Sequence, residues 1–374
     1  MNKTLMIVGM GDLAGLVLNL LAQEPVARLV LASRNADEMA RRKNLASLFA
    51  AQLGRYPQIE CVPIDLADEA STAEAIARVS PDVIYNTATL QSWRIITQLP
   101  PATFQALDEA QFGPWLPMHL SLVRRLMRAV KASGLDPVVV NAAFPDAVGP
   151  VLRGAGLAPT VGVGNVANVV PAMRGAIGLL ADVPLESVRL RLFTQHYLSH
   201  RVPAAGDSGG APYFAHAEAD GRTLDVDMES AFGLVKTRFQ RTGGAFRQMI
   251  TAASSVSVLR PLLTGETAHV HAPAPGGLPG GYAVRVQNGH VELDLPAGLT
   301  LERAVALNED CQRFDGIDRI DPDGTVHFTA QEMAIMTRMM GYECLRMPLD
   351  EVDDRAAELG AKYREFQRKA HAAV

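Results

Sequence analysis

The chain has 374 residues, of which 48% are apolar and 20% charged, and its formal net charge is −5 at pH 7. This length suits two domains of ordinary size, and the composition is that of a globular protein. The charge balance and the lack of a basic stripe argue against a nucleic-acid partner, and no apolar run is long enough to span a membrane.

The three cysteines, Cys61, Cys311 and Cys344, lie far apart in the sequence. They give neither a disulfide framework nor a zinc-binding spacing, and buried structural thiols are the simplest interpretation. The first residues lack the long apolar region and cleavage site of a signal peptide. We therefore expect a cytoplasmic protein that binds no metal ion.

The opening of the chain predicts a dinucleotide site. A short apolar strand, Leu5–Val8, runs into the sequence GMGDLA at residues 9–14, and a helix is predicted from Leu13 to Leu21. This matches the fingerprint G-x-G-x-x-G/A between a strand and a helix, where helix amides face a pyrophosphate. The alternative is a degenerate glycine-rich turn that binds nothing. The predicted pyrophosphate-binding residues are Gly9, Gly11, Asp12, Leu13 and Ala14.

The next strand, Ala27–Ala32, ends in Ser33 and Arg34. NAD-preferring sites usually carry an acidic residue here, which binds the ribose 2′-hydroxyl. A hydroxyl and a guanidinium suit a 2′-phosphate instead, because arginine offers a planar fork of donors. We therefore expect NADP (NADPH) as the cofactor. The alternative for Arg34 is a solvated surface arginine, which is how we interpret residues 41–43.

Predicted strands and helices alternate up to residue 150, which is typical of a parallel sheet covered by helices on both faces. We expect an α/β fold, with a Rossmann doubly wound domain at residues 1–150 and a second α+β substrate and dimerisation domain at residues 151–374. Within the first domain, strands are predicted at Ile59–Ile64, Val83–Tyr85 and Val138–Val140, and helices at Ala36–Gln52, Ser71–Arg78 and Trp115–Ser133.

Three of these strands end in small or polar residues. Ligands of such sheets bind at the carboxyl ends of the strands, so we expect these residues to reach the cofactor. For each of them the alternative is a turn-forming or capping role. The predicted ligands are Asp65 and Leu66 on the adenine side, and Asn86, Thr87, Ala88 and Asn141 toward the ribose and nicotinamide.

The second half predicts a final core strand near Thr160–Asn165, a helix at Val169–Leu180 and a strand at Val188–Phe193. Thr194–Pro212 and Ala272–Gly281 are rich in glycine and proline, and we interpret both as loops, either mobile lids or ordinary surface connections. Asn288-Gly289 predicts a hairpin turn. Helices are predicted at Leu301–Phe314, Ala330–Met340 and Glu351–His371; the methionine stripe of the second is interpreted as core or subunit interface, and a homodimer is expected.

The fingerprint at residues 9–14 together with Ala32-Ser33-Arg34 resembles the NADP domains of saccharopine-dehydrogenase-like and carboxynorspermidine-dehydrogenase-like proteins. The resemblance is clearest up to about residue 145. It implies a Rossmann oxidoreductase that uses NADP. An amino-acid-derived imine as substrate is implied by analogy only.

A looser resemblance, to lactate and malate dehydrogenases, begins at Asn141. In those families a strand ending in an N-P-x-D turn precedes a G-x-G-x-N-type segment, and Asn141–Leu152 followed by Gly162–Arg174 is similar in layout. The sequence departs from the family at residues 141–146, where NAAFPD replaces the contiguous turn, and shortly after Asn165, where the expected aspartate and arginine are absent. The proton-relay pair of 2-hydroxy-acid dehydrogenases therefore cannot be carried over.

Histidines just after the strand at Val188–Phe193 are the candidates for proton transfer, because imidazole titrates near neutral pH. His196 is the first candidate and His200 the second, with His216 farther along; each has a surface or structural role as its alternative. No third ligand accompanies His196 and His200 to make a metal site. Arg94 and Arg201 are candidates for binding a substrate carboxylate, and Asp146 for orienting a histidine.

These residues together predict an NADP-dependent reductase of a carbonyl or imine in a small polar, carboxylated substrate, with His196 as proton donor. One alternative is an NAD(P)-dependent epimerase or lyase that uses redox chemistry transiently. Another is a non-enzymatic protein that senses NADP.

Overall fold

The computed structural model describes residues 3–24, 26–242, 246 and 248–372. Its main sheet has six parallel strands in the order β3-β2-β1-β4-β5-β6. This is the doubly wound order of dinucleotide-binding folds, which places the switch point between β1 and β4. The predicted α/β class is confirmed. The strands are β1 (Lys3–Val8), β2 (Ala27–Ser33), β3 (Ile59–Pro63), β4 (Val83–Asn86), β5 (Val138–Asn141) and β6 (Val161–Gly162).

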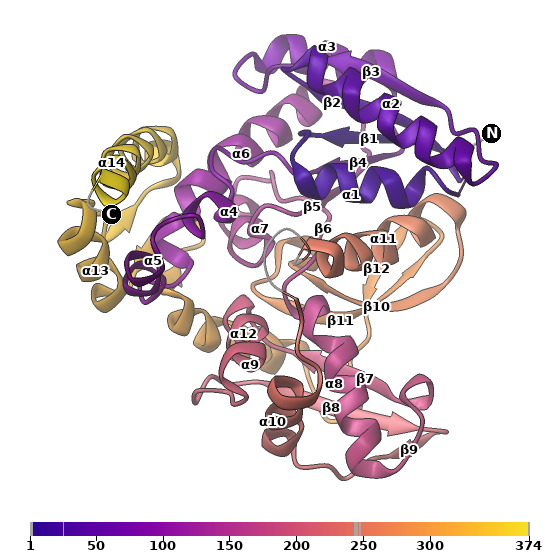
Figure 1. The fold of residues 1–374 in the computed structure, drawn as a ribbon, viewed down its shortest axis with the longest axis vertical. Coiled ribbons are helices and arrows are strands. Elements are labelled where there is room, and N and C mark those ends of the chain that lie inside the picture. The colour runs from indigo at the N-terminus through magenta and orange to yellow at the C-terminus, as the bar shows by residue number, and fades with distance from the viewer. Residues whose placement is uncertain (1–2, 25, 243–245, 247, 373–374) are drawn as a thin grey trace.

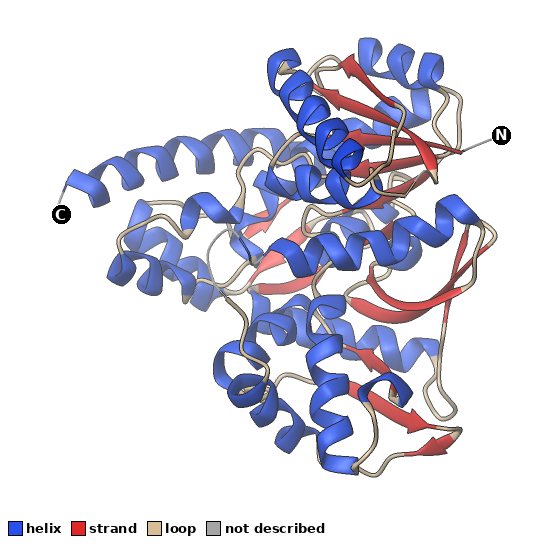
Figure 2. Cartoon of the chain, turned by 45° about the vertical axis from the view of Figure 1, so that its right-hand side comes forward, coloured by secondary structure: helices blue, strands red, loops and turns tan. Residues whose placement is uncertain are grey.

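Helices cover both faces of this sheet (Figures 1 and 2). One face is filled by side chains of α3 and α6 around the buried ring of Trp115. The other is filled by α1 and α2, and by α11 from the second half of the chain, which packs against α1. The helices of this half are α1 (Asp12–Leu21), α2 (Ala36–Gln52), α3 (Glu69–Val79), α4 (Trp93–Ile96), α5 (Pro101–Asp108), α6 (Leu116–Ala132) and α7 (Pro145–Arg153).

The second half contains two antiparallel three-stranded sheets, β7-β8-β9 and β10-β11-β12, joined by a bridge between Thr194 and Gly281. The strands are β7 (Arg189–Phe193), β8 (Phe214–Ala219), β9 (Arg222–Thr223), β10 (Ala268–Pro273), β11 (Gly281–Gln287) and β12 (His290–Leu293). The helices are α8 (Val166–Ala181), α9 (His196–Ala205), α10 (Met228–Arg238), α11 (Gln248–Thr264) and α12 (Leu301–Gln312). The predicted hairpin turn is confirmed, since Asn288 and Gly289 both have positive φ between β11 and β12.

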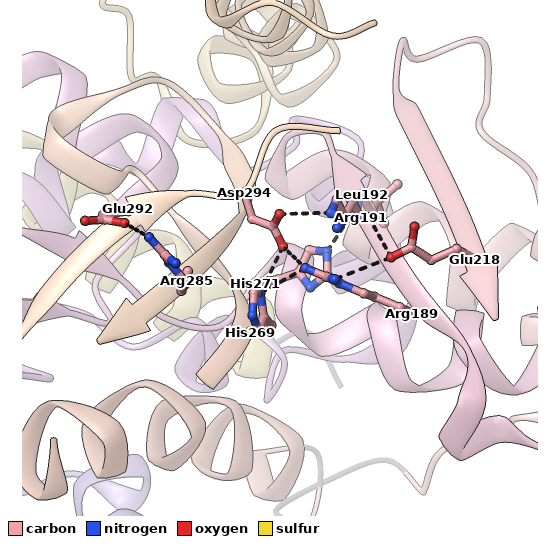
Figure 3. A network of polar contacts seen from close by, with 9 residues as sticks. All are labelled: Arg189, Arg191, Leu192, Glu218, His269, His271, Arg285, Glu292 and Asp294. Carbon is pink, nitrogen blue, oxygen red and sulfur yellow. Dashed lines mark hydrogen bonds and ion pairs between the residues drawn. The ribbon is translucent and has the colours of Figure 1, made fainter. Parts of the chain in front are cut away.

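A polar network joins these two small sheets (Figure 3). Asp294 receives hydrogen bonds from Arg189 and Arg191 of β7, at 2.8 and 3.0 Å. Beside it the buried His271 of β10 accepts the Leu192 amide through Nε2, at 3.0 Å, so its proton is on Nδ1. These hydrogen bonds hold the two small sheets in a fixed position relative to each other, and helices connected to these sheets line the cleft.

His271 predicts an acid sensitivity of the fold. Burial lowers its pKa to about 4, whereas an unfolded histidine titrates near pH ~6.5. The folded state therefore binds fewer protons, and the stability due to neutral His271 is present above pH ~6.5 and is lost as the pH falls toward 4. Urea unfolding of His271→Leu should show a shallower loss of stability across this window than the wild type, although its stability at neutral pH is lower. Identical pH slopes would contradict the assignment.

The C-terminal segment packs on the first domain. It contains β13 (Ile317–Ile320), β14 (Val326–Phe328), α13 (Ala330–Met340), β15 (Arg346–Met347) and α14 (Val352–Ala372). Its apolar side chains share one hydrophobic cluster with α3 and α6, and the ring of Tyr363 lies 5.4 Å from that of Trp115. Met333 and Met336 are buried in this cluster, which confirms the interpretation of the methionine stripe as core.

Two predicted loops are wrong. Thr194–Pro212 contains helix α9, which begins after Gln195, buries Leu198 and Val202, and ends at the left-handed Gly206. The sequence pattern did not reveal this i, i+4 apolar pair, because the segment is dominated by proline, glycine, serine and histidine. Residues 272–281 are neither a lid nor a surface connection, because all of them except Gly276 are buried. Here glycine permits close packing: a Cβ on Gly277 would lie 2.9 Å from the Cβ of Ala158.

Candidate active site

A large cleft lies at the carboxyl ends of the main-sheet strands and has a volume of about 2310 Å³. Ligand pockets for small molecules are typically roughly 300–1,000 Å³, so this cleft has room for a dinucleotide and a second small molecule. Its walls come from the first domain, from α8 to α11 and from the C-terminal segment. The predicted residues that line it are Gly9, Gly11, Asp12, Leu13, Ser33, Arg34, Asp65, Leu66, Thr87, Ala88, Arg94, His196 and His200.

The glycine-rich turn has the geometry that its sequence predicts. Gly9 has φ +90°, and a Cβ there would lie 2.9 Å from the Ala88 amide nitrogen, so only glycine fits. At Gly11 an added Cβ would meet nothing within 4 Å, which leaves open space above the backbone. No side chain caps the start of α1, so its first amides are available to an anion. Ala14 is buried beneath, where it packs the helix onto the sheet.

Asp12 at the start of α1 is bracketed by two arginines. Arg42 of α2 lies 3.5 Å from one carboxylate oxygen, and Arg94 of α4 forms an ion pair with the other. The two guanidinium groups offset the carboxylate at a position where the fingerprint predicts a pyrophosphate. Arg94 therefore lies over the glycine-rich turn.

The ends of β2 and β3 border the part of the cleft for which the adenosine was predicted. Arg34 is exposed and lines the cleft together with Ser33. Leu66 is buried with its edge in the cleft. Asp65 accepts the Ala67 amide at 2.9 Å, so it also forms the turn that was its alternative role.

The β4 and β5 ends differ from what was predicted for them. Asn86 donates to Asn141 at 2.9 Å, and both side chains are buried outside the cleft lining. This pair ties β4 to β5 below the cleft floor, and Thr87 and Ala88 form the floor itself. Thr87 donates its hydroxyl to the Val8 carbonyl at 3.0 Å, which fixes the loop after β4 against the glycine-rich turn.

His196 is the first residue of α9, and its backbone amide donates to the side chain of Gln195. Its Nδ1 lies 2.9 Å from a carboxylate oxygen of Asp315, a residue that is only 2% exposed. A carboxylate at Nδ1 fixes the neutral tautomer with the proton on that nitrogen, and leaves Nε2 to exchange a proton with a bound molecule. This is the arrangement expected of a general acid–base histidine.

The surrounding charges act on this imidazole. Burial by itself disfavours a charge on His196, but the carboxylates of Asp315 and, farther away, Asp146 favour it, and the net effect raises its pKa. Complete burial raises the pKa of Asp146 to about 6, against the opposing effects of His196 and of a hydrogen bond from Asn165. Burial therefore brings the pKa of Asp146 closer to physiological pH, and shifted pKa values of this kind are common at proton-transfer sites.

Aromatic rings enclose the histidine. Phe112 stacks on His196 with ring centroids 4.8 Å apart, and Phe144 meets it edge-on at 5.7 Å. His119 of α6 packs against the far side of Phe112, at 4.9 Å. Burial and the neighbouring His196 lower the pKa of His119 to about 3, so this second histidine is neutral at physiological pH.

Three residues that line the cleft have strained backbones. Gln111 has φ +57°, Phe144 has φ +42° and Asn165 has φ +51°, all positive for residues other than glycine. Phe144 and Asn165 follow β5 and β6, and the side-chain Nδ2 of Asn165 donates to the carboxylate of buried Asp146. Such strain persists where the surrounding structure holds it, most often at functional sites.

Of the remaining candidates, His200 lies near this centre. It lines the cleft, its ring stacks on that of His196 with centroids 6.4 Å apart, and its Nε2 lies 3.8 Å from a carboxylate oxygen of Asp108 of α5. Arg201 instead forms an ion pair with Asp207 at 2.8 Å. His216 lies on β8, opposite Arg191 in the register of the β7–β8 ladder. Neither Arg201 nor His216 lines the cleft. Sequence reasoning missed Asp315, His119 and Phe112. No signal marked Asp315, because it follows a helix 119 residues after its partner.

Within residues 3–24, 26–242, 246 and 248–372, no group of three or more histidine, cysteine or acidic side chains is arranged to hold a metal ion. Within the same part of the chain, no helix combines the length and apolar character needed to cross a bilayer.

Comparison with known proteins supports the dinucleotide fold. Residues 3–139 match the family model described as KR domain. No curated protein matches the chain. Among solved structures, lactate dehydrogenase of Cryptosporidium parvum, in complex with lactic acid and b-nicotinamide adenine dinucleotide, is similar with a TM-score of 0.55 and 15% identity, over 84% of this chain and 96% of that one.

Two malate dehydrogenases are similar to the same degree. That of Plasmodium falciparum has a TM-score of 0.56 and 14% identity, over 83% of this chain and 96% of its own. That of Aeropyrum pernix has a TM-score of 0.56 and 16% identity, over 83% and 97%. At these identities the likeness establishes the fold. The resemblance to saccharopine-type and carboxynorspermidine-type dehydrogenases is not confirmed.

Proposed function

We propose that the chain is an NAD(P)-dependent dehydrogenase or reductase that uses NADPH to reduce a carbonyl or imine. The observation that carries the proposal is the His196–Asp315 pair, which opens into the same cleft as the glycine-rich turn. The KR match over the first domain and the dehydrogenase folds of the solved structures support it.

The residues of the turn fit a dinucleotide. The positive φ of Gly9, the open space at Gly11 and the uncapped start of α1 form a cradle for a pyrophosphate. Ser33 and Arg34 at the end of β2 support the 2′-phosphate of NADP over the hydroxyl of NAD. When bound, the nicotinamide supplies the hydride, and the protein must orient the substrate and provide a proton.

His196 performs the proton transfer in this proposal. Its protonated Nε2 donates a proton to the developing alkoxide oxygen of a carbonyl substrate, or to the developing amine nitrogen of an imine substrate. Asp315 meanwhile accepts from Nδ1 and stabilises the imidazolium form. Phe112 and Phe144 exclude water from the imidazole, which strengthens its interaction with the carboxylates.

The substrate class follows from the polar groups of the cleft. Arg94 can bind a substrate carboxylate bidentately if it exchanges its Asp12 partner, and His200 adds a second donor beside His196. We therefore propose a small polar, carboxylated, amino-acid-derived substrate. We also expect a homodimer in the cytoplasm, with residues 1–150 as the cofactor domain and residues 151–374 as the substrate and dimerisation domain.

A substrate panel tests this proposal. NADPH absorbance is followed with the protein and a set of 2-keto acids, each with and without an amine that forms the imine. Substrate-dependent, stoichiometric oxidation of NADPH is expected. Conversion of substrate without net cofactor use would indicate an epimerase or lyase, and NADPH binding with no turnover across the panel would favour a sensing protein.

A further inference from the structure

The C-terminal helix α14 packs along α6 and contributes residues to the lining of the cleft. It lies beyond the part of the chain that matches the family model, residues 3–139. In Figure 1 it stands at the side toward which the main-sheet strands run, next to α6. One stripe of this helix lines the same cleft as the glycine-rich turn, through Asp353, Ala356, Ala357, Gly360 and Arg364.

Hydrogen bonds fix the position of this stripe. Asp353 accepts the Ser121 hydroxyl at 2.6 Å and the Arg125 guanidinium at 3.0 Å, both from α6. Near the other end, Tyr363 donates to the Ile95 carbonyl of α4 at 3.2 Å. The helix therefore runs antiparallel along α6 and forms a rigid wall of the cleft.

The wall faces the adenosine half of the proposed cofactor site. Ser121, Leu122 and Arg125 of α6 line the cleft together with Leu66 and Ala67, which follow β3. In doubly wound sheets the adenosine lies at the ends of the second and third strands, beyond the pyrophosphate turn. Because α14 is bonded to these same α6 residues, its stripe borders that space.

Side-chain size and charge suit such a ligand. A Cβ on Gly360 would lie 3.3 Å from Cε of Met118 and 3.3 Å from Nη1 of Arg364. The helix surface is therefore closely packed at Gly360, and no side chain projects from this position into the cleft. The Asp353 carboxylate is neutralised by Arg124 and Arg125. Arg364 gives one edge of this wall a positive charge, which favours a phosphorylated ligand.

We propose that α14 is a cofactor-binding element whose surface at Ala356, Ala357 and Gly360 packs against the adenosine phosphate half of the dinucleotide. This inference rests on the proposed function, because it takes the ligand of the cleft to be NADP. It makes the C-terminal segment part of the cofactor site.

Ala357 provides the test, because its side chain is exposed in the cleft and can be enlarged without disturbing the core. Ala357→Leu should weaken binding of NADPH and of adenosine 2′,5′-bisphosphate, which lacks the nicotinamide, by about tenfold or more, because the larger side chain would occupy space that the ligand fills. Binding is measured by calorimetry, and melting temperatures establish that the variants are folded.

Ala361→Leu is the matched control, since Ala361 is exposed on the same helix and lies outside the cleft lining. It should bind both ligands like the wild type. Unchanged affinity in Ala357→Leu, or equal losses in both variants, would overturn the role of α14 and leave the proposed function standing. A wild-type protein that binds neither NADPH nor the bisphosphate would overturn both.

Discussion

Replacing His196 by alanine is expected to abolish turnover while leaving NADPH affinity nearly intact. The imidazole faces the cleft from α9, next to the aromatic rings, whereas the pyrophosphate cradle is formed by Gly9 to Leu13 of the first domain. A positioned general acid contributes roughly 10²–10⁴-fold to a rate, so the loss in kcat should be of this size. Substrate-dependent NADPH oxidation and a separate cofactor titration measure the two effects.

His216→Ala is the control for this variant, because His216 lies on β8 outside the cleft lining. It should retain wild-type turnover. Normal turnover in His196→Ala would remove His196 from the mechanism, and an equal loss in both variants would show a general effect on the fold.

The role of Asp315 as a positioning residue is tested by a pH profile. Its carboxylate helps to raise the pKa of His196, and reduction requires the protonated imidazole. The rate of reduction should therefore fall as the pH rises through the His196 pKa, and in Asp315→Asn this fall should occur at lower pH. A profile at the wild-type position, with only a reduced maximum, would show that Asp315 acts on the fold alone.

Arg34→Asp is expected to weaken NADPH far more than NADH. Arg34 is exposed at the end of β2, and a charge-assisted hydrogen bond to a 2′-phosphate is worth about 1.5–3 kcal/mol, so the selective loss should be roughly ten- to hundredfold. NADH has no group for this guanidinium to bind. Titrations of both cofactors against the same variant measure the ratio.

Arg55→Asp carries the same charge change at an exposed position outside the cleft lining. It should leave both affinities unchanged, which separates a local contact from a change in overall charge. Equal losses of NADPH and NADH in Arg34→Asp would contradict the 2′-phosphate assignment.

The first domain was predictable because its signals are local. The turn at Gly9 needs a positive φ that glycine adopts freely, and the helix predicted at Ala36–Gln52 is observed over these residues, capped by the side chain of Asn35. The Rossmann class was predicted because local signals for strands and helices alternate up to residue 150. Residues that line the cleft at the ends of β2 and β3 could be named for the same reason.

The second half of the chain and the surroundings of His196 were less predictable, because tertiary contacts decide them. Helix α9 was concealed by the composition of residues 194–212, and residues 272–281 are buried although their composition is typical of a surface loop. Asp315 meets His196 only because the segment after α12 returns to the start of α9. Asn86 and Asn141 reach each other below the cleft floor, a choice of rotamer that the sequence does not encode locally.

Titration of the purified protein with NADPH and NADH, followed by nicotinamide fluorescence, tests the central proposal most directly. Tight binding that favours NADPH is predicted from the cradle at Gly9 to Leu13 and from Arg34. A preference for NADH would contradict the assignment of NADP alone. Binding of neither cofactor would contradict the proposed oxidoreductase function itself.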